Sequence, residues 1–227
     1  MKFSTYASHR ASDLVQYRDN YEMICENWRK KSLDWDYEER YAALGLPGYV
    51  EGKMPITYYG TDYVIEASDG TIHEASDWNK ELEFQTLMSI YHIFYYSREN
   101  PRNANIWIPF RDVKRAAPFA EAFQRQTLEP FAKAFDGKAE KLQAAGEKLG
   151  FLRLCQSDVG FQAMAFPCMP LQFLFWDGDD EFGAQTNILF DANITDFVHE
   201  ETVVMIADQG VRRLIEAAEL EVTQGVI

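Results

Sequence analysis

The sequence has few cysteines and no long apolar run. Its 227 residues include three cysteines, Cys25, Cys155 and Cys168, and no C-x-x-C pair. An odd, widely spaced set argues against a disulfide framework and against a zinc or iron–sulfur site, and indicates free thiols. No window approaches the roughly 20 apolar residues of a membrane span, and the N-terminus lacks a signal-peptide core. We therefore expect a cytoplasmic protein without a membrane partner, and we assign no residue of it to a metal.

Positive charge is also scarce. The chain has 22 Lys and Arg against 36 Asp and Glu, a formal net charge of −14. So acidic a chain is a poor partner for phosphate backbones, and we expect no nucleic-acid partner. With 47% hydrophobic residues it has enough apolar material for its own core. Because no repeat or low-complexity linker divides the chain, we predict a single domain over residues 1–227.

The signatures of common enzymes are missing too. The chain has no G-x-S-x-G nucleophile elbow, no phosphate-binding loop and no G-x-G-x-x-G after a strand. His199-Glu200-Glu201 resembles the start of a metalloprotease helix, but Val203 stands where the second histidine belongs. No catalytic residue, cofactor or oligomeric state follows from these motifs.

The first third of the chain predicts two helices and a small antiparallel meander. Apolar side chains at three- and four-residue steps indicate a first helix of about twenty residues; they are Leu14, Tyr17, Tyr21, Ile24, Cys25 and Trp28. Asp36-x-x-Glu39 reads as a capping box for a second helix that stops at Gly45 and Pro47. Three short β-branched and aromatic runs follow, 56–59, 62–66 and 71–73, with the hairpin signal Asp69-Gly70 between the last two.

The rest of the chain returns to helices and then to strands. Residues 78–96 are apolar all round and predict a helix at the centre of the core. A short strand (106–109), a helix of Phe119, Phe123, Phe131 and Phe135 bent at Pro130, and a helix over 138–148 come next. Apolar strands at 161–166, 171–176 and 187–190 precede a closing amphipathic helix. Because helices and strands come in blocks, we predict an α+β fold with a mainly antiparallel sheet packed with helices.

The most concentrated polar feature is the acidic run Trp176-Asp177-Gly178-Asp179-Asp180-Glu181-Phe182, directly after an apolar strand. A calcium loop of the EF-hand type is excluded, because Phe182 and Ile188 occupy the positions that need Gly and Glu. Another hard-cation site or a catalytic carboxylate pair are open alternatives. The favoured interpretation is a solvated turn whose carboxylates accept hydrogen bonds from local backbone amides.

Charge is unevenly distributed along the chain. Residues 101–150 carry nine basic and six acidic residues, whereas residues 151–227 carry three and thirteen. Arg111, Lys114 and Arg115 are spaced to share one helical face and are the nearest source of compensating cations. We favour an ion-pair network between the two segments, with a small anionic ligand on the Arg111 cluster as the alternative.

Two histidines are of interest. His92 lies in the most apolar helix and is interpreted as a hydrogen-bonded core residue rather than a metal ligand. His199 precedes the closing helix, where it caps the helix or, alternatively, acts as an acid–base group near Asp191. We expect the many aromatic residues to belong mainly to the core, with a pocket for a flat ligand as the alternative.

Several strings together resemble the domain-of-unknown-function 3786 family of bacteria and archaea. They are Phe166-Pro167 through Phe182, Asn187 to Asp191, His199-Glu200-Glu201, Trp107 to Val113, and Tyr58-Tyr59-Gly60-x-x-Tyr63. The resemblance covers roughly residues 10–215 and implies one domain, but no activity, since the family is uncharacterised. Relatives with an added iron–sulfur segment would imply redox chemistry, whereas this chain has no cysteine cluster.

The leading hypothesis is an accessory protein that binds a small ligand or a protein partner at an acidic and aromatic pocket. An enzyme that uses the same carboxylates for acid–base or hard-metal chemistry is the alternative, and an interaction protein without a pocket is a third possibility. The candidate ligand-binding residues are Trp176, Asp177, Asp179, Asp180, Glu181, Asp191, His199 and Arg111.

Overall fold

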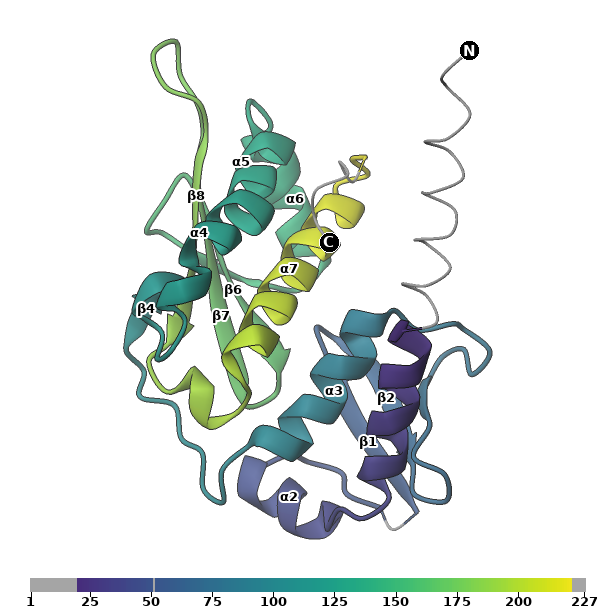
Figure 1. The fold of residues 1–227 in the computed structure, drawn as a ribbon. Coiled ribbons are helices and arrows are strands. Elements are labelled where there is room, and N and C mark those ends of the chain that lie inside the picture. The colour runs from purple at the N-terminus through teal and green to yellow at the C-terminus, as the bar shows by residue number, and fades with distance from the viewer. Residues whose placement is uncertain (1–19, 51, 222–227) are drawn as a thin grey trace, which may run out of the picture.

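The described residues, 20–50 and 52–221 of the computed structural model, fold in the order of blocks that the hydrophobic pattern predicts (Figure 1). The N-terminal lobe contains a helix over residues 20–32, α2 (Tyr37–Leu44), β1 (Lys53–Tyr58), β2 (Thr61–Glu66), β3 (Ile72–Glu74) and α3 (Phe84–Tyr96). The C-terminal lobe contains β4 (Trp107–Pro109), α4 (Ala120–Phe123), α5 (Glu129–Phe135), α6 (Ala139–Lys148), β5 (Leu152–Leu154), β6 (Val159–Phe166), β7 (Met169–Trp176), β8 (Gln185–Asp191) and α7 (Glu200–Ala217).

Both sheets are antiparallel, with strand orders β1-β2-β3 and β4-β8-β7-β6-β5. This confirms the α+β class, with β5 as a strand that the pattern does not predict. One continuous apolar core joins the two lobes. None of the described helices is long and apolar enough to cross a bilayer.

The local signals at the start of the chain act as predicted. The Asp36 carboxylate accepts a hydrogen bond from the Glu39 amide at 2.9 Å and so caps α2, which ends at Gly45 in the left-handed conformation (φ 63°). Of the first predicted helix, residues 20–32 are helical, whereas Leu14 and Tyr17 lie outside the described residues. The three-strand meander is also confirmed.

The central helix α3 is shorter than predicted. It begins at Phe84 instead of residue 78, because the preceding segment forms other local bonds. The Asp77 carboxylate accepts a hydrogen bond from the Asn79 amide at 3.1 Å, and Lys80 binds Glu74 at 2.7 Å. Such short-range side-chain bonds compete with helix formation. Residues 75–83 therefore form an irregular segment beside β3, and this segment lines two cavities.

The phenylalanine-stepped segment is interrupted, as its proline suggests. α4 and α5 are separated by a π-helical turn over Gln124–Leu128, and Pro130 stands in the first turn of α5. Proline has no amide N–H to continue the ladder of hydrogen bonds, so the ladder breaks there. Phe123, Phe131 and Phe135 are nevertheless all buried on one side, against the large sheet.

The basic face predicted for Arg111, Lys114 and Arg115 does not exist. Phe110–Asp112 form a single 3-10 turn, Val113 is extended (ψ 137°), and Arg115 has a positive φ of 66°. Val113 is buried and ends this turn, with its amide donating to the Phe110 carbonyl. Arg111 is exposed, and its guanidinium lies 3.9 Å from the carboxylate of Asp112. One ion pair, Lys148–Glu219 at 3.9 Å, joins segments 101–150 and 151–227 within the described chain, so the predicted network is largely absent.

α7 connects the two lobes. It lies beside α3 and across the inner face of the large sheet (Figure 1). Gly210 is the closest approach: a Cβ there would lie 2.4 Å from the Phe173 ring and 2.7 Å from the Tyr59 hydroxyl. The Tyr59 hydroxyl donates to the Ile206 carbonyl at 2.8 Å, and the Tyr58 hydroxyl donates to the Gln209 side chain at 2.6 Å. α7 can therefore seat against both lobes only because position 210 has no side chain.

Gly210→Ala should destabilise the protein although it replaces glycine inside a helix. The gain of about 1 kcal/mol in helix propensity is outweighed by overpacking against Phe173, so we expect a net loss of roughly 1–3 kcal/mol in the free energy of unfolding. Urea denaturation measures it. Gly183→Ala is the control, because a Cβ there meets nothing within 4 Å, and an equal effect of the two substitutions would contradict the packing argument.

Candidate functional site

The acidic run forms the loop between β7 and β8, and its first carboxylate serves the backbone. One oxygen of Asp177 accepts hydrogen bonds from the amides of Gly137 at 2.8 Å and Gly178 at 3.0 Å. The amide of Asp177 in turn donates to the Asp158 carboxylate at 2.9 Å. The Asp177 carboxylate therefore connects the loop to the residues that follow α5.

The remainder of the loop is an exposed turn. The Asp179 carboxylate accepts hydrogen bonds from the amides of Glu181 and Phe182, both at 2.8 Å, and these bonds lower its pKa. Asp180 and Glu181 are exposed, and Phe182 has 65% of its surface in solvent. Within residues 20–50 and 52–221 no group of three His, Cys, Asp or Glu side chains is placed to hold a metal ion.

Asp191 lies at the other end of β8 and is buried, with 1% of its surface exposed. Its carboxylate accepts three backbone hydrogen bonds, from Ala104 at 2.8 Å, Asn105 at 2.6 Å and Asn193 at 2.9 Å. These bonds join β8 to the chain that enters β4. The carboxylate has the contacts of a structural anchor.

The predicted ligand-binding residues do not lie around one cavity. Trp176 pairs with Gln185 at one end of β8, whereas Asp191 pairs with Trp107 at the other. His199 caps α7 by accepting a hydrogen bond from the Glu201 amide at 3.4 Å, which is the capping role favoured from the sequence. Arg111 is exposed elsewhere. The structure therefore brings together neighbours within the acidic loop but not the set as a whole.

Asp191→Asn tests the anchor. The amide would turn an NH2 group toward backbone donors, so we expect a loss of about 2–4 kcal/mol in the free energy of unfolding. Asp180→Asn, an exposed site in the acidic loop, should change it by less than about 0.5 kcal/mol. Chemical denaturation of the two variants compares them, and equal stabilities would remove the anchoring role from Asp191.

The N-terminal lobe contains a cavity that none of these predicted residues lines. It is a groove of about 680 Å³ between the helix over residues 20–32, β3, the irregular segment 75–83 and α3. Its walls are mainly aromatic and aliphatic: Tyr21, Cys25, Ile72, His73, Trp78, Leu82, Phe84, Leu87 and Tyr91. We call this cavity the apolar groove. It exists because residues 75–83 do not continue α3.

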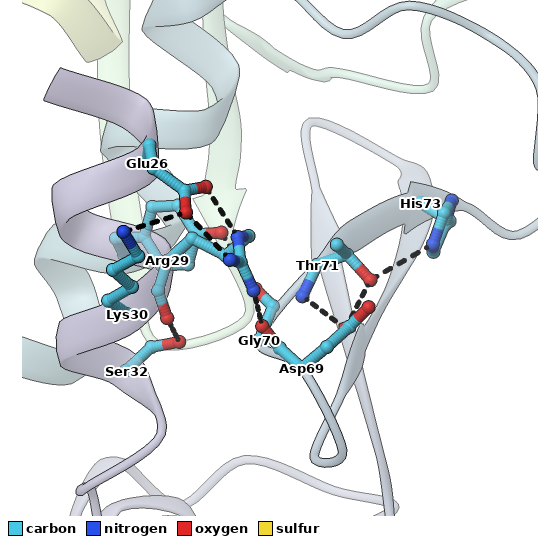
Figure 2. Close-up of polar contacts among 9 residues, drawn as sticks. Glu26, Arg29, Lys30, Ser32, Asp69, Gly70, Thr71 and His73 are labelled. Carbon is cyan, nitrogen blue, oxygen red and sulfur yellow. Dashed lines mark hydrogen bonds and ion pairs between the residues drawn. The ribbon is translucent and has the colours of Figure 1, made fainter. Parts of the chain in front are cut away.

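A polar cluster holds the helix over residues 20–32 against the turn between β2 and β3 (Figure 2). The Arg29 guanidinium donates two hydrogen bonds to Glu26, at 2.7 and 2.8 Å, and a third to the Asp69 carbonyl. Gly70 allows the approach, since a Cβ there would meet the Arg29 carbonyl at 2.5 Å. The Tyr91 hydroxyl donates to the Gly70 carbonyl at 2.7 Å. Three elements of the groove are thus fixed at one turn.

The rim of the groove is also preorganised. The His73 ring stacks on Trp78 with 4.5 Å between centroids, and its two nitrogens contact the Trp78 carbonyl at 3.1 Å and the Thr71 hydroxyl at 3.2 Å. Trp78 keeps 43% of its surface exposed. Burial raises the pKa of the Cys25 thiol, which faces the groove as a neutral group.

Sequence reasoning missed this groove because it treated Leu82, Leu87 and Tyr91 as core positions of a longer helix. The available signal was the polar stretch Asn79-Lys80-Glu81 next to Trp78, which is poorly suited to a buried helix. His92, by contrast, is the core histidine expected. It contacts the Thr202 hydroxyl at 2.8 Å, and burial lowers its pKa to about 4.

The sequence also did not single out Asp208, a buried carboxylate on α7 with 4% of its surface exposed. Burial raises its pKa to about 6, with the charge of Glu83 acting in the same direction, although Arg212 is bound at 3.0 Å. A carboxylate that ionises so reluctantly makes stability depend on pH.

Asp208→Asn should therefore change the pH dependence of stability. The folded-state pKa of about 6 exceeds the ordinary 3.8, so the contribution of Asp208 falls as pH rises from about 4 to about 6. Relative to wild type, the free energy of unfolding of the variant should improve by about 2 kcal/mol between pH 4 and pH 7. Urea titrations at the two pH values measure this. A difference independent of pH would contradict it.

Comparison with known protein families finds a match over most of the chain. A model of the family described as "Domain of unknown function (DUF3786)" matches residues 36–213. No curated protein and no solved structure matches the chain. The matched region contains the hairpin, α3 and residues 200–213 of α7, and it begins after the helix that forms one wall of the groove.

Proposed function

We propose that this chain, which belongs to the DUF3786 family of unknown function, binds a small and largely apolar molecule in the apolar groove. The observation that carries the proposal is a groove of about 680 Å³ lined mainly by aromatic and aliphatic side chains. Ligand sites are typically concave, apolar and about 300–1,000 Å³ in volume. Apolar surface gathered in a concavity of this size is unusual unless something covers it.

The fixed walls support binding of a molecule rather than collapse of the groove. Arg29, Gly70 and Tyr91 hold the helix, the hairpin turn and α3 in one arrangement. Preorganised walls lower the conformational entropy lost when a ligand binds. The stacked pair His73 and Trp78 offers a flat surface at the rim.

The chemistry of the lining indicates the class of ligand. Both nitrogens of His73 and the Arg29 guanidinium are already hydrogen-bonded, so recognition depends on shape and ring contacts. At the rim, Arg29 is paired with Glu26 and Lys80 with Glu74, whereas Glu81 forms no ion pair among the described residues. An uncharged aromatic molecule therefore fits better than an anion of the same shape. The free thiols of the described cysteines support a cytoplasmic place of action.

Two dyes that differ by one sulfonate group test this class. N-phenyl-1-naphthylamine is neutral, and 1-anilinonaphthalene-8-sulfonate carries a sulfonate on the same rings. We expect saturable binding of the neutral dye, about fivefold tighter than the anionic one at low salt, from roughly 1 kcal/mol of repulsion at the rim. Fluorescence titration measures both affinities. Tighter binding of the sulfonate would overturn the assigned ligand class.

Two matched tryptophan substitutions test whether the dye binds in the apolar groove. Leu87→Trp adds bulk inside the groove and should weaken binding of the neutral dye at least tenfold, whereas Leu152→Trp, on exposed β5, should not change it. Bound dye should also slow alkylation of Cys25 and leave the rate at exposed Cys155 unchanged, as read by peptide mass spectrometry. Unchanged affinity in Leu87→Trp, with a cooperative unfolding transition, would exclude the groove as the site.

A further inference from the structure

A second cavity, separate from the apolar groove, lies where the two lobes meet. It is a cleft of about 160 Å³ walled by β2, β3, the segment 80–83, the start of α3 and the last turns of α7. We propose that this interlobe cleft binds a small zwitterion of the α-amino acid type, with its carboxylate on Arg213 and its ammonium group facing Glu81, Glu83 and Glu216. The proposal goes beyond the function of the groove.

Arg213 is the cation available to a ligand. Its guanidinium lies over the rings of Tyr58 and Tyr59, 5.6 and 5.5 Å from their centroids, and donates one hydrogen bond to the Thr61 hydroxyl at 3.1 Å. Across the described ranges no carboxylate oxygen lies within the 4.0 Å of an ion pair with it. A guanidinium has five N–H donors, and its planar fork matches a carboxylate.

The other two cations of the cleft are already paired. Lys80 binds Glu74 at 2.7 Å, and Arg212 binds Asp208 at 3.0 Å. Each pairing satisfies the charge of a specific carboxylate, and none involves Arg213. The Tyr58 and Tyr59 rings hold the Arg213 guanidinium in place, so little side-chain entropy is lost when it binds an anion.

The acidic side of the cleft selects a zwitterion over a simple anion. Glu81 and Glu216 form no ion pair in the described part of the chain, and the Glu83 carboxylate accepts one long hydrogen bond, from Gln209 at 3.4 Å. With four glutamates against three cations around the cleft, an inorganic phosphate would meet net repulsion. A ligand with one negative and one positive end meets a complementary charge at each.

The floor of the cleft is rigid. The Gln209 side chain accepts a hydrogen bond from the Tyr58 hydroxyl at 2.6 Å and donates one to the Thr86 hydroxyl at 2.8 Å. These groups come from β1, α3 and α7, and all three are buried. A ligand on this floor would contact both lobes at once, and binding to the folded state raises Tm by mass action.

The ligand is tested on the wild-type chain. The twenty common free amino acids are screened by thermal shift, and the best is titrated by calorimetry. Its N-acetyl derivative lacks the ammonium charge, its amide lacks the carboxylate charge, and each should bind at least tenfold more weakly. Inorganic phosphate should not raise Tm. Failure of every amino acid to raise Tm, or equal binding of the three forms, would overturn the proposal.

Variants then place the ligand. Arg213→Gln should weaken binding at least tenfold, Arg213→Lys should restore part of it, and the exposed Arg111→Gln should leave it unchanged. Glu216→Gln should weaken the free amino acid more than its N-acetyl derivative. If Arg213→Gln does not fold, the affinities of Arg213→Lys and Glu216→Gln for the amino acid test whether it binds in the cleft. Full affinity in both would exclude the cleft. Leu87→Trp should keep amino-acid binding, which separates this outcome from failure of the groove.

Discussion

The turn between β1 and β2 is the constraint on which the two-lobe arrangement depends. Tyr59 adopts a positive φ of 48° and Gly60 one of 75°, a geometry that costs a non-glycine residue about 1–3 kcal/mol. The Tyr59 amide donates to the Ala165 carbonyl at 2.8 Å, and its hydroxyl donates to the Ile206 carbonyl at 2.8 Å. Hydrogen bonds to β6 and α7 and complete burial of the ring offset the strain. This turn therefore fixes the small sheet to the large one and to α7.

Both cavities follow from the segment that connects the small sheet to α3. Residues 75–83 are not part of α3 and form an irregular connection between β3 and α3. A cavity lies on each side of this connection. On one side the cavity is apolar and faces the helix over residues 20–32, whereas on the other it is charged and faces α7. Lys80, Glu81 and Leu82 line both cavities. One irregular segment therefore borders two cavities whose walls differ in chemistry.

Local signals made much of the fold predictable. The capping box at Asp36, the turn at Asp69-Gly70 and the break at Pro130 act over a few residues, and each has the predicted effect. The α+β class follows from the blocks of helix and strand. The predicted start of α3 was wrong by six residues, because Asp77 and Lys80 form side-chain hydrogen bonds that compete with helix formation.

The sites were harder to predict because they depend on contacts distant in sequence. The acidic loop attracted attention by composition, yet its Asp177 and Asp179 carboxylates bind backbone amides, and Asp191 lies at the opposite end of β8. The Arg213 guanidinium is positioned by Tyr58, Tyr59 and Thr61, which are about 150 positions away in the chain. The pKa of Asp208 is raised because its side chain is buried in the folded protein. Periodicity and spacing along one chain contain no information on such pairings.

The contacts of α7 have a consequence for synthesis of the protein. Tyr58 and Gln209 are separated by 151 positions in the chain, and Tyr59 and Ile206 by 147. A chain grows at about 5–20 residues per second, so the hairpin waits roughly 7–30 seconds for its partner helix. During that interval Tyr58, Tyr59 and Phe173 lack the cover that α7 provides in the native state. The nascent chain is therefore most exposed to aggregation and to chaperone binding just before its last helix is made.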